Sequence, residues 1–334
     1  MSLRSKGNPP RPKIAAFFTG GTISMKVDPQ AGGAVPALCG KEILDLIPEI
    51  ASTAEVKVYD VGQWPGPHVT PQRMLELAHR VEEQLAQGGV VGAIVTHGTD
   101  TLEETAYLLS LTLQTTKPVV FVGAMRNGSQ PSWDGPANLL SAVRVASEIG
   151  SQGRGVLICL NDTILPAEDG TKTHTVGLHS FQGRDGGPLG RVDDGRIQWH
   201  RNAPLPEKIQ TTQISEAVEI VKLAAGSDGR LALAAADSGA EGLVIEGLGC
   251  GNVPITALPN LEKVLARGIP VIIATRCHQG PTSEAYAYPG AARTLKERGA
   301  ILAGSLPSHK ARMKLMVLLG AGKNLTDIRQ AFER

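Results

Sequence analysis

Hydroxyl, carboxylate and glycine residues gather at three points where an apolar run gives way to a polar turn. The first is TGGTI at residues 19–23, which follows the apolar run 14–18. Two glycines allow a tight turn and a close backbone approach to a ligand. A threonine on that turn could act as a nucleophile, with backbone N–H groups beside it for a developing oxyanion. A Gly-Gly pair alone is more often simply a turn, and the GxxxxGK[ST] pattern of a phosphate-binding loop is absent.

The other two points carry polar residues at the start of a predicted helix. In THGTDTLEE, residues 96–104, Thr99 and Asp100 could supply catalytic groups or could simply cap the helix. Thr101 and Glu104 have the spacing of a capping box. GAMR, residues 123–126, leads through a polar loop to a second helical pattern, where capping is again the simpler interpretation. Each motif alone leaves both interpretations open.

Strand and helix patterns alternate along the first 200 residues. This alternation predicts a doubly wound α/β domain with a mostly parallel sheet. Ligands of such sheets bind at the carboxyl ends of the strands, where the three polar turns lie. Buried parallel strands are predicted from continuous apolar runs at residues 14–18, 90–95, 118–122 and 155–160. Helices are predicted from apolar periodicity at residues 70–87, 100–113 and 136–149, the first with Thr70 as cap and Pro71 as first residue.

A change of composition divides the chain into two predicted α/β domains, the second one smaller. The divisions are a disordered basic tail at 1–12, an N-terminal domain at 13–202, a linker at 203–229 and a C-terminal domain at 230–334. The linker is expected to carry one helix at 215–225. The C-terminal domain is expected to hold strands at 231–236 and 270–275, an apolar run at 242–245, and helices at 258–267, 291–298 and from 308 onward.

Charge and cysteine content exclude several classes of partner. Lys+Arg (33) and Asp+Glu (32) nearly cancel, so no strong field attracts nucleic acid or an anionic membrane. The four cysteines lack CxxC spacing, which argues against a disulfide framework or a zinc site, and Cys159 is expected to be a buried small hydrophobe. The apolar stretch near the N-terminus is too short for a signal peptide or a membrane span. We expect a cytoplasmic protein with no metal and no cofactor.

Taken together, the ordered motifs resemble those of the bacterial-type L-asparaginase/glutaminase family. TGGTI at 19–23 is similar to the first signature of that family, and HGTDT at 97–101 with EETA at 103–106 is similar to the second. The resemblance runs from about residue 13 to the C-terminus and implies the two-domain asparaginase fold. Further matches are GAMR at 123–126, DGPxNL at 134–139, NDT at 161–163, TKT at 171–173, GPLG at 187–190 and GxGN at 249–252.

The resemblance implies an amidohydrolase with a threonine nucleophile. Thr22 would attack the amide carbon and form an acyl-enzyme, which water then hydrolyses. The Thr–Asp–Lys set of the family corresponds to Thr99, Asp100 and Lys172. Lys172 would favour proton loss from Thr99 or act as a neutral base, and Asp100 would bind the α-ammonium of the substrate. Without the resemblance, Lys172 would be interpreted as a solvated surface lysine. The same correspondence assigns substrate binding to Gly21, Gly98 and Ala124.

The resemblance also implies a homotetramer, a dimer of intimate dimers that share active sites. Asn252, on a glycine-rich loop of the second domain, would then reach the site of the neighbouring subunit; otherwise it is an ordinary turn residue. In the divergent segment 276–290, both Glu284 and Tyr286 are candidates for the same role.

Two segments that contact the substrate in the family, the loop after the first signature and the turn at 60–70, depart here from the family pattern. Most members carry a tyrosine on a mobile loop after the first signature, and here Ala34 stands at that position. The turn at 60–70 is about three residues longer, lacks the serine that grips the α-carboxylate, and places His68 where an Asp is usual. Gln63 could donate to a carboxylate, and Trp64 with His68 could line a pocket for a different group. Alternatively, Trp64 only packs over the loop and His68 is only exposed.

These observations lead to one main hypothesis and two alternatives. The main hypothesis is hydrolysis of a small, L-asparagine-like amino-dicarboxylic amide with release of ammonia. The alternatives are a hydrolase for a related amide, imide or lactam with different α-substituents, and a catalytically weak homologue that binds an amino acid. Joint retention of Thr22, Thr99, Asp100 and Lys172 argues against the weak homologue, because a pure binder has little use for the hydroxyl–lysine pair.

Overall fold

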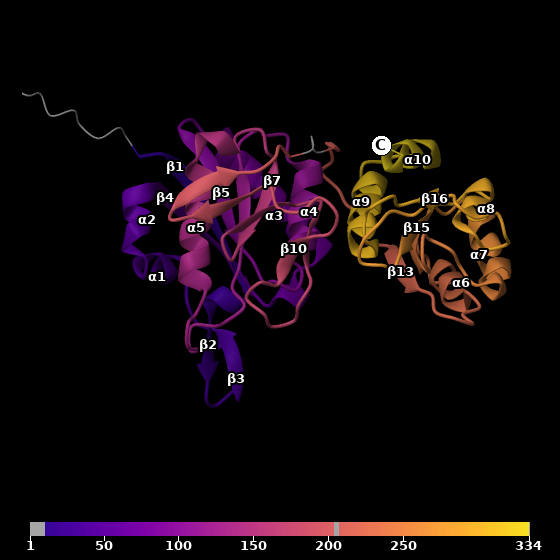
Figure 1. Ribbon diagram of the computed structural model, residues 1–334, viewed down its shortest axis with the longest axis horizontal. Helices are drawn as coiled ribbons and strands as arrows, with labels where there is room; N and C mark the ends of the chain where they lie inside the picture. Colours follow the sequence, from indigo (N-terminus) through magenta and orange to yellow (C-terminus); the bar gives the residue numbers. More distant parts are fainter. Residues whose placement is uncertain (1–10, 204–206, 334) are drawn as a thin grey trace, which may run out of the picture.

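The computed structural model describes residues 11–203 and 207–333, which form two α/β domains side by side (Figure 1). Most of the tail expected at 1–12 and part of the expected linker lie outside these residues. Arg11 and Pro12, which the tail was expected to include, contact the first domain. The carbonyl of Pro12 accepts a hydrogen bond from the Glu55 N–H at 2.9 Å, and Arg11 donates to the carbonyl of Ala51.

The first domain is built on an eight-stranded sheet with a parallel centre. Its strand order is β12-β11-β8-β7-β6-β5-β1-β4. The strands from β7 to β4 pair in parallel, whereas the pairs β7–β8, β8–β11 and β11–β12 are antiparallel. All four strands expected from apolar runs are confirmed in this centre. The strands are β1 (Lys13–Gly20), β4 (Glu55–Trp64), β5 (Val90–Thr96), β6 (Val119–Val122), β7 (Val156–Leu160), β8 (Thr163–Pro166), β11 (Gly190–Asp193) and β12 (Arg196–Trp199).

Helices cover both faces of this sheet. Along β1, Ala15 and Phe17 join the apolar cluster beneath α3 and α4, whereas Ile14, Ala16 and Phe18 join the cluster beneath α1, α2 and α5. Successive strand residues point to opposite faces, so a sheet covered on both sides requires an uninterrupted apolar run. The doubly wound fold is therefore confirmed. The helices are α1 (Gly40–Asp45), α2 (Pro48–Thr53), α3 (Pro71–Ala86), α4 (Leu102–Thr112) and α5 (Gly135–Ser147).

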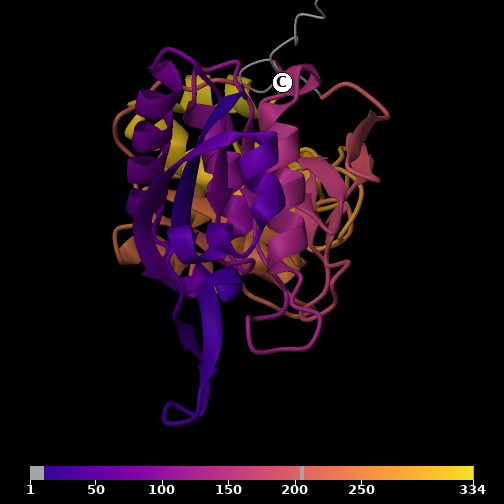
Figure 2. The same cartoon turned by 90° about the vertical axis from the view of Figure 1, so that its left-hand side faces the viewer.

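Two small hairpins lie outside the main sheet. β2 (Met25–Asp28) and β3 (Gly33–Pro36) form one that projects from the body of the domain (Figure 2). β9 (Gly170–Lys172) and β10 (Phe181–Gly183) form the other. The second hairpin delivers Lys172, the last residue of β9, to the region of the strand ends.

The second domain has a four-stranded parallel sheet with helices on both faces. Strands follow the order β13-β14-β15-β16, with α6, α7 and α8 on one face and α9 and α10 on the other (Figure 1). The elements are β13 (Val218–Lys222), α6 (Arg230–Asp237), β14 (Gly242–Gly247), α7 (Leu258–Leu265), β15 (Val271–Thr275), α8 (Ala292–Glu297), β16 (Ile301–Leu302), α9 (Ser308–Gly320) and α10 (Leu325–Phe332).

The structure corrects two expectations for this part of the chain. The helix expected at 215–225 is strand β13, which places residues 218–222, assigned to the linker, in the second sheet. The strand expected at 231–236 is helix α6. Ala232 and Ala236, four residues apart, are buried, whereas Leu231 is 66% exposed, as on a helix that covers a sheet with one face. Alanine and leucine favour the helix here, and such a short apolar run does not reveal its period.

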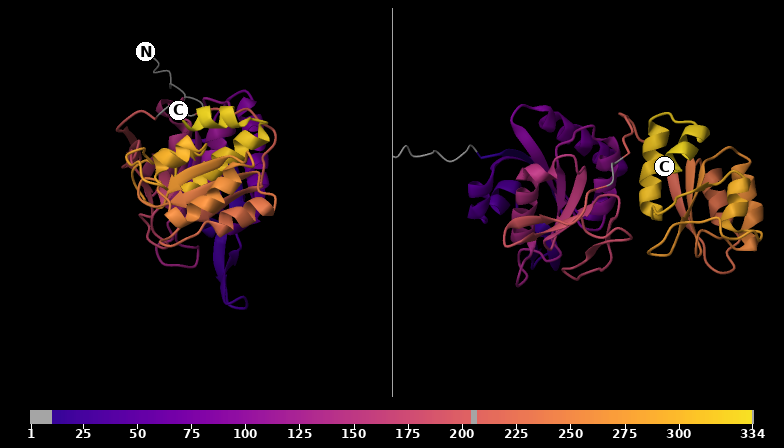
Figure 3. Two further views of the ribbon diagram at one scale, coloured as in Figure 1. Left: turned by 90° about the vertical axis from the view of Figure 1, so that its right-hand side faces the viewer. Right: turned by 45° about the horizontal axis from the view of Figure 1, so that its top comes forward.

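The two domains meet along α4 and α9 (Figure 3). Leu108 and Leu111 of α4 and Met313 of α9 belong to one buried apolar cluster that extends into both domains. Arg184, which follows β10, adds polar contacts by donating to carbonyls of the second domain, including that of His278 at 2.6 Å. The domains of one chain are thus joined by a continuous core and not only by the connecting segment.

Candidate active site

Glycines bring the predicted signatures into backbone contact at the carboxyl ends of the strands. A methyl group added to Gly21 would lie 2.5 Å from the Gly98 nitrogen, and one added to Gly98 would lie 2.6 Å from the Gly66 nitrogen. Gly21 also has a φ of 83°, in the left-handed region that other residues rarely adopt. The two signatures and the turn after β4 can therefore approach only as glycines. This contact places Thr22, the residue after Gly21, beside the segment that carries Thr99.

Lys172 connects the two polar residues of the second signature. Its Nζ donates to Thr99 Oγ1 at 2.8 Å and to Asp100 Oδ1 at 2.7 Å. The Lys172 side chain is only 15% exposed, so it is not a solvated surface lysine. Thr99 is buried, whereas the Asp100 side chain is 59% exposed. An ammonium that donates to a hydroxyl favours loss of the hydroxyl proton, and the exposed carboxylate remains accessible to a cationic substrate group.

The start of α4 separates the capping and catalytic interpretations. Thr101 is the residue before the helix, and its side chain makes no capping bond to the helix N–H groups. Its Oγ1 instead donates to the carbonyl of Gly66 at 2.7 Å, which fixes the turn after β4 against the second signature. Thr99 and Asp100 precede the cap and pair with Lys172. The capping interpretation of these two residues is therefore wrong.

Asp134 fixes the turn of the third signature, as Thr101 fixes the turn after β4. Its two carboxylate oxygens accept the backbone N–H groups of Met125 at 3.0 Å and Arg126 at 2.9 Å, and it makes no side-chain cap to α5. Ala124, the residue before this pair, is fully buried in the core beneath α5. Asp134 therefore holds the turn after β6 in shape.

The extended turn after β4 adjoins the same site. A methyl group added to Gly66 would lie 3.3 Å from Asp100 Cβ. Gln63, the second-last residue of β4, and His68, on the turn itself, are both exposed. The guanidinium of Arg73 lies 4.7 Å from the centre of the Trp64 ring, and Trp64 also packs against the apolar cluster beneath α3. Trp64 therefore packs over the loop, whereas the side chains of Gln63 and His68 are exposed.

No tyrosine of the first domain replaces the missing loop tyrosine. Ala34 is exposed on the projecting hairpin, paired with Val27 of β2. The tyrosines of the first domain are Tyr59, which stacks on Phe17 with ring centres 5.0 Å apart, and Tyr107, which is buried in the core. Neither is available to assist Thr22 within this chain.

The candidates of the second domain make their contacts within that domain. Asn252 accepts a hydrogen bond from the Ala292 N–H at 3.2 Å, and Glu284 pairs with Lys296 at 2.7 Å. Tyr286 is 51% exposed and lies beside a second exposed tyrosine. None of these contacts involves the strand ends of the first domain, so a single chain does not join these three residues to Lys172.

His97 and Glu103 lie inside the motifs and have supporting roles that the sequence pattern does not reveal. The His97 ring is fully buried and bonds to the Gly98 carbonyl at 2.9 Å and to Thr105 Oγ1 at 2.9 Å. Burial lowers the pKa of His97 to about 4, so the ring is neutral and fixes the turn at Gly98. Glu103 Oε1 accepts the backbone N–H of Lys172 at 3.0 Å. In the sequence, the only feature that points to these roles is that both residues lie within three positions of Thr99 or Asp100.

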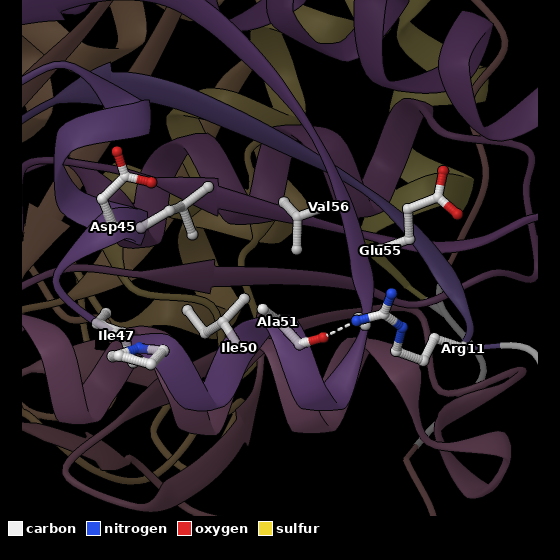
Figure 4. Close-up of a pocket in the computed structure, with 10 residues that line it drawn as sticks. Arg11, Asp45, Ile47, Ile50, Ala51, Glu55 and Val56 are labelled. Carbon is white, nitrogen blue, oxygen red and sulfur yellow. Dashed lines mark hydrogen bonds between the residues drawn. The ribbon is translucent and has the colours of Figure 1, made fainter. Parts of the chain in front are cut away.

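A separate cavity of about 420 Å³ lies between α1, α2 and β4 (Figure 4). Its lining includes the apolar side chains of Ile47, Ile50 and Val56, together with Arg11 and Glu55. It lies on the side of the first domain away from the second (Figure 1). It contains none of the residues that the sequence analysis selected.

Comparison with known proteins identifies the family. Residues 13–205 match the model "Asparaginase, N-terminal", and residues 217–332 match "Glutaminase/Asparaginase C-terminal domain". The chain is 42% identical to a probable L-asparaginase of Deinococcus radiodurans, covering 96% of this chain and 97% of that protein. It is 35% identical to an L-asparaginase of Bacillus licheniformis, covering 93% and 96%. A probable cytoplasmic L-asparaginase from Campylobacter jejuni has the same fold, with a TM-score of 0.87, 29% identity and coverage of 97% and 100%.

The chain therefore belongs to the bacterial-type L-asparaginase family, as its motifs predicted. It is an amidohydrolase, an enzyme that acts on carbon–nitrogen bonds of amides and releases ammonia. Among the described residues, no helix combines the length and apolar character that crossing a membrane requires.

Proposed function

We propose that the enzyme hydrolyses small amino-dicarboxylic amides of the L-asparagine type through an acyl-enzyme on Thr22. The observation that carries this proposal is the Lys172–Thr99–Asp100 arrangement, and the close approach of Gly21, the residue before Thr22, to Gly98 supports it. A threonine hydroxyl is a weak nucleophile at neutral pH and needs an adjacent proton acceptor. The hydrogen-bonded Thr99–Lys172 pair supplies one.

The reaction has two steps. Thr22 Oγ attacks the amide carbon while its proton passes to Thr99 Oγ1, which has lost its own proton beside the Lys172 ammonium; Thr99 then returns this proton to the nitrogen, which leaves as ammonia. The resulting ester is attacked by water, which releases the carboxylic acid and restores the Thr22 hydroxyl. Asp100 binds the α-ammonium of the substrate; its pairing with Lys172 uses Oδ1 and leaves the side chain more than half exposed. Gly21, Gly98 and Ala124 shape the pocket through their backbones.

The substrate turn supports a modified specificity. Gln63 and His68 are exposed on either side of Gly66, which approaches Asp100, in the segment where the family pattern has a carboxylate-binding serine and an Asp. The amide of Gln63 and the ring of His68 present different hydrogen-bonding groups from the serine hydroxyl and the carboxylate of the family pattern. This observation favours the second candidate function, hydrolysis of an amide, imide or lactam whose α-substituents differ from those of L-asparagine.

We further propose a cytoplasmic homotetramer in which paired subunits complete each other's sites. Asn252, Glu284 and Tyr286 bind partners only within the second domain, and Tyr286 is largely exposed. These residues are thus available to the site of a neighbouring subunit. The cytoplasmic location is supported by free thiols at all four cysteines and by the similarity to the Campylobacter protein, which is described as cytoplasmic.

Ammonia release from a panel of amides tests the proposal. The panel comprises L-asparagine, L-glutamine, their D-forms, and analogues substituted at the α-amino or α-carboxyl group. Thr22→Ala is expected to lower kcat on the best substrate by about two to four decades. Thr19→Ser is the matched control on the same strand end, since Thr19 Oγ1 donates to the Thr96 carbonyl at 2.7 Å and serine retains this bond. Full activity of Thr22→Ala would show that the nucleophile is a different residue.

A further inference from the structure

Glu103 connects the catalytic lysine to the second domain of its own chain. It lies in the first turn of α4, directly after the second signature, and its side chain is only 8% exposed. One oxygen, Oε1, accepts the backbone N–H of Lys172 at 3.0 Å. The other, Oε2, bonds to His309 Nε2 at 2.8 Å and lies 3.7 Å from Lys310 Nζ. A single carboxylate therefore contacts β9 on one side and the first turn of α9 on the other.

Lys310 holds the chain that leads into β9. Its side chain is completely buried, and Nζ donates to the carbonyls of Ala167 at 2.9 Å, Glu168 at 3.2 Å and Gly170 at 2.7 Å. The first two carbonyls lie between β8 and β9, and the third belongs to the first residue of β9. A buried ammonium needs such partners, because burial strongly disfavours its charge. The second domain therefore fixes the backbone two to five residues before Lys172.

From this geometry we propose that Glu103 is a positioning residue that aligns Lys172 with Thr99 and transmits the placement of α9 to the active site. The proposal rests on the function proposed above for Lys172. Glu103 itself contacts neither Thr99 nor Asp100 through the bonds just described; it acts on the backbone of the residue whose Nζ contacts both. With the main-chain nitrogen held by Glu103 and the Nζ held by Thr99 and Asp100, both ends of Lys172 are fixed.

The carboxylate form of Glu103 suits this role. Burial alone would raise the pKa of Glu103, but the hydrogen bond from His309 and the charge of Lys310 lower it to about 2. Glu103 is therefore an acceptor at both oxygens throughout the physiological range. Its neighbour Glu104 differs, since burial raises the pKa of that carboxyl. Of these two glutamates, Glu103 is the one that contacts Lys172, His309 and Lys310.

The test compares steady-state kinetics of Glu103→Asp and Glu103→Gln, with the best amide of the panel as substrate. Asp keeps the charge but withdraws the oxygens by one methylene, whereas Gln keeps an acceptor at full length. We expect Glu103→Asp to lower kcat about tenfold to a hundredfold with KM nearly unchanged, because a misplacement of about 1 Å costs on that order. We expect Glu103→Gln to stay within about fivefold of the wild type. The reverse order, or wild-type kcat in Glu103→Asp, would overturn the proposal.

A double-mutant cycle separates positioning from general stability. If Glu103 acts through Lys172, adding Glu103→Asp to Lys172→Met lowers kcat no further, to within about twofold; multiplied losses would refute the proposal. Glu207→Ala is the matched control, since Glu207 pairs at 2.6 Å with Lys314, another largely buried lysine of α9. It should lower the melting temperature and leave kcat unchanged. An equal loss of kcat in Glu207→Ala would show that domain docking in general is responsible.

The two proposals fail in distinguishable ways. If Lys172→Met retains wild-type kcat, the proposed role of Lys172 is wrong, and positioning by Glu103 is wrong with it. If Lys172→Met loses activity while Glu103→Asp retains it, only the positioning proposal is wrong.

Discussion

Acid stability should depend strongly on the ionisation of Glu103. Its pKa falls from the ordinary value of 4.5 to about 2 in the folded protein, although burial acts in the opposite direction. The charged groups that face it are Lys310 and His309 from α9, with Arg184 from the segment after β10 and Glu104 from its own helix. A depressed carboxyl pKa means that the unfolded chain binds the proton more tightly than the folded one. Ionised Glu103 therefore stabilises the folded state above about pH 4.5, and this contribution is lost as pH falls through 2.

The magnitude follows from the shift. A difference of about 2.5 pKa units corresponds to about 3 kcal/mol at neutral pH. At pH 3 the unfolded group is almost fully protonated while most of the folded group is still ionised, which leaves about 1 kcal/mol. Glu103→Gln imitates the protonated carboxyl at every pH. The difference in unfolding free energy between wild type and variant should therefore narrow by about 2 kcal/mol between pH 7 and pH 3.

Urea unfolding at several pH values in this range, followed by circular dichroism, measures the difference. Glu104 and the other titrating groups are present in both proteins, so their contributions largely cancel. The same difference at pH 3 and pH 7 would refute the reasoning, because it would mean that Glu103 has the same proton affinity in the folded and unfolded chains. A difference that widens toward acid would mean that burial outweighs His309 and Lys310.

Three further outcomes are expected. Lys172→Met should lower kcat by about two to four decades, with the melting temperature within a few degrees of the wild type, since Lys172 contacts Thr99 and Asp100 near the surface; a fully active variant would contradict its role. Sedimentation should reveal a tetramer, or at least an intimate dimer, and an active monomer would exclude shared sites. For L-asparagine, kcat/KM should lie below about 10⁴ M⁻¹s⁻¹, because the lost charge-assisted bond to the α-carboxylate costs about 1.5–3 kcal/mol; a higher value would show that Gln63 or His68 replaces the missing groups.

Local signals were sufficient for the central strands and for the start of α3. Each of β1, β5, β6 and β7 is buried on both faces, and such strands need an apolar side chain at nearly every position. Thr70 caps α3 by accepting the Arg73 N–H at 3.3 Å, with Pro71 as the first helical residue. These features depend on residues close in sequence, and the sequence therefore predicts them.

The errors lie where local pattern and tertiary position disagree. β13 is an edge strand in which Val218 and Val221, three residues apart as on a helix, are buried, and its five residues are flanked by alanines and charged groups that also suit a helix. Helix α6 is rich in alanine, which a buried strand and a helix both accommodate in so short a run. Only pairing with β14 in the first case, and packing against the second sheet in the other, decides the outcome.

Lys310 shows why the support of the site could not be derived from the sequence. A lysine near the start of a helix is ordinarily exposed, and no local pattern indicates that this one is completely buried. Its partners at 167–170 lie 140 to 143 residues earlier, and Glu103 is separated from His309 by 206 residues. These bonds exist only because apolar side chains of α4 and α9 pack together and bring the first turn of α9 against β9. Motifs thus predict which groups react, whereas the bonds that hold the backbone around Lys172 come from a domain contact that contains no motif.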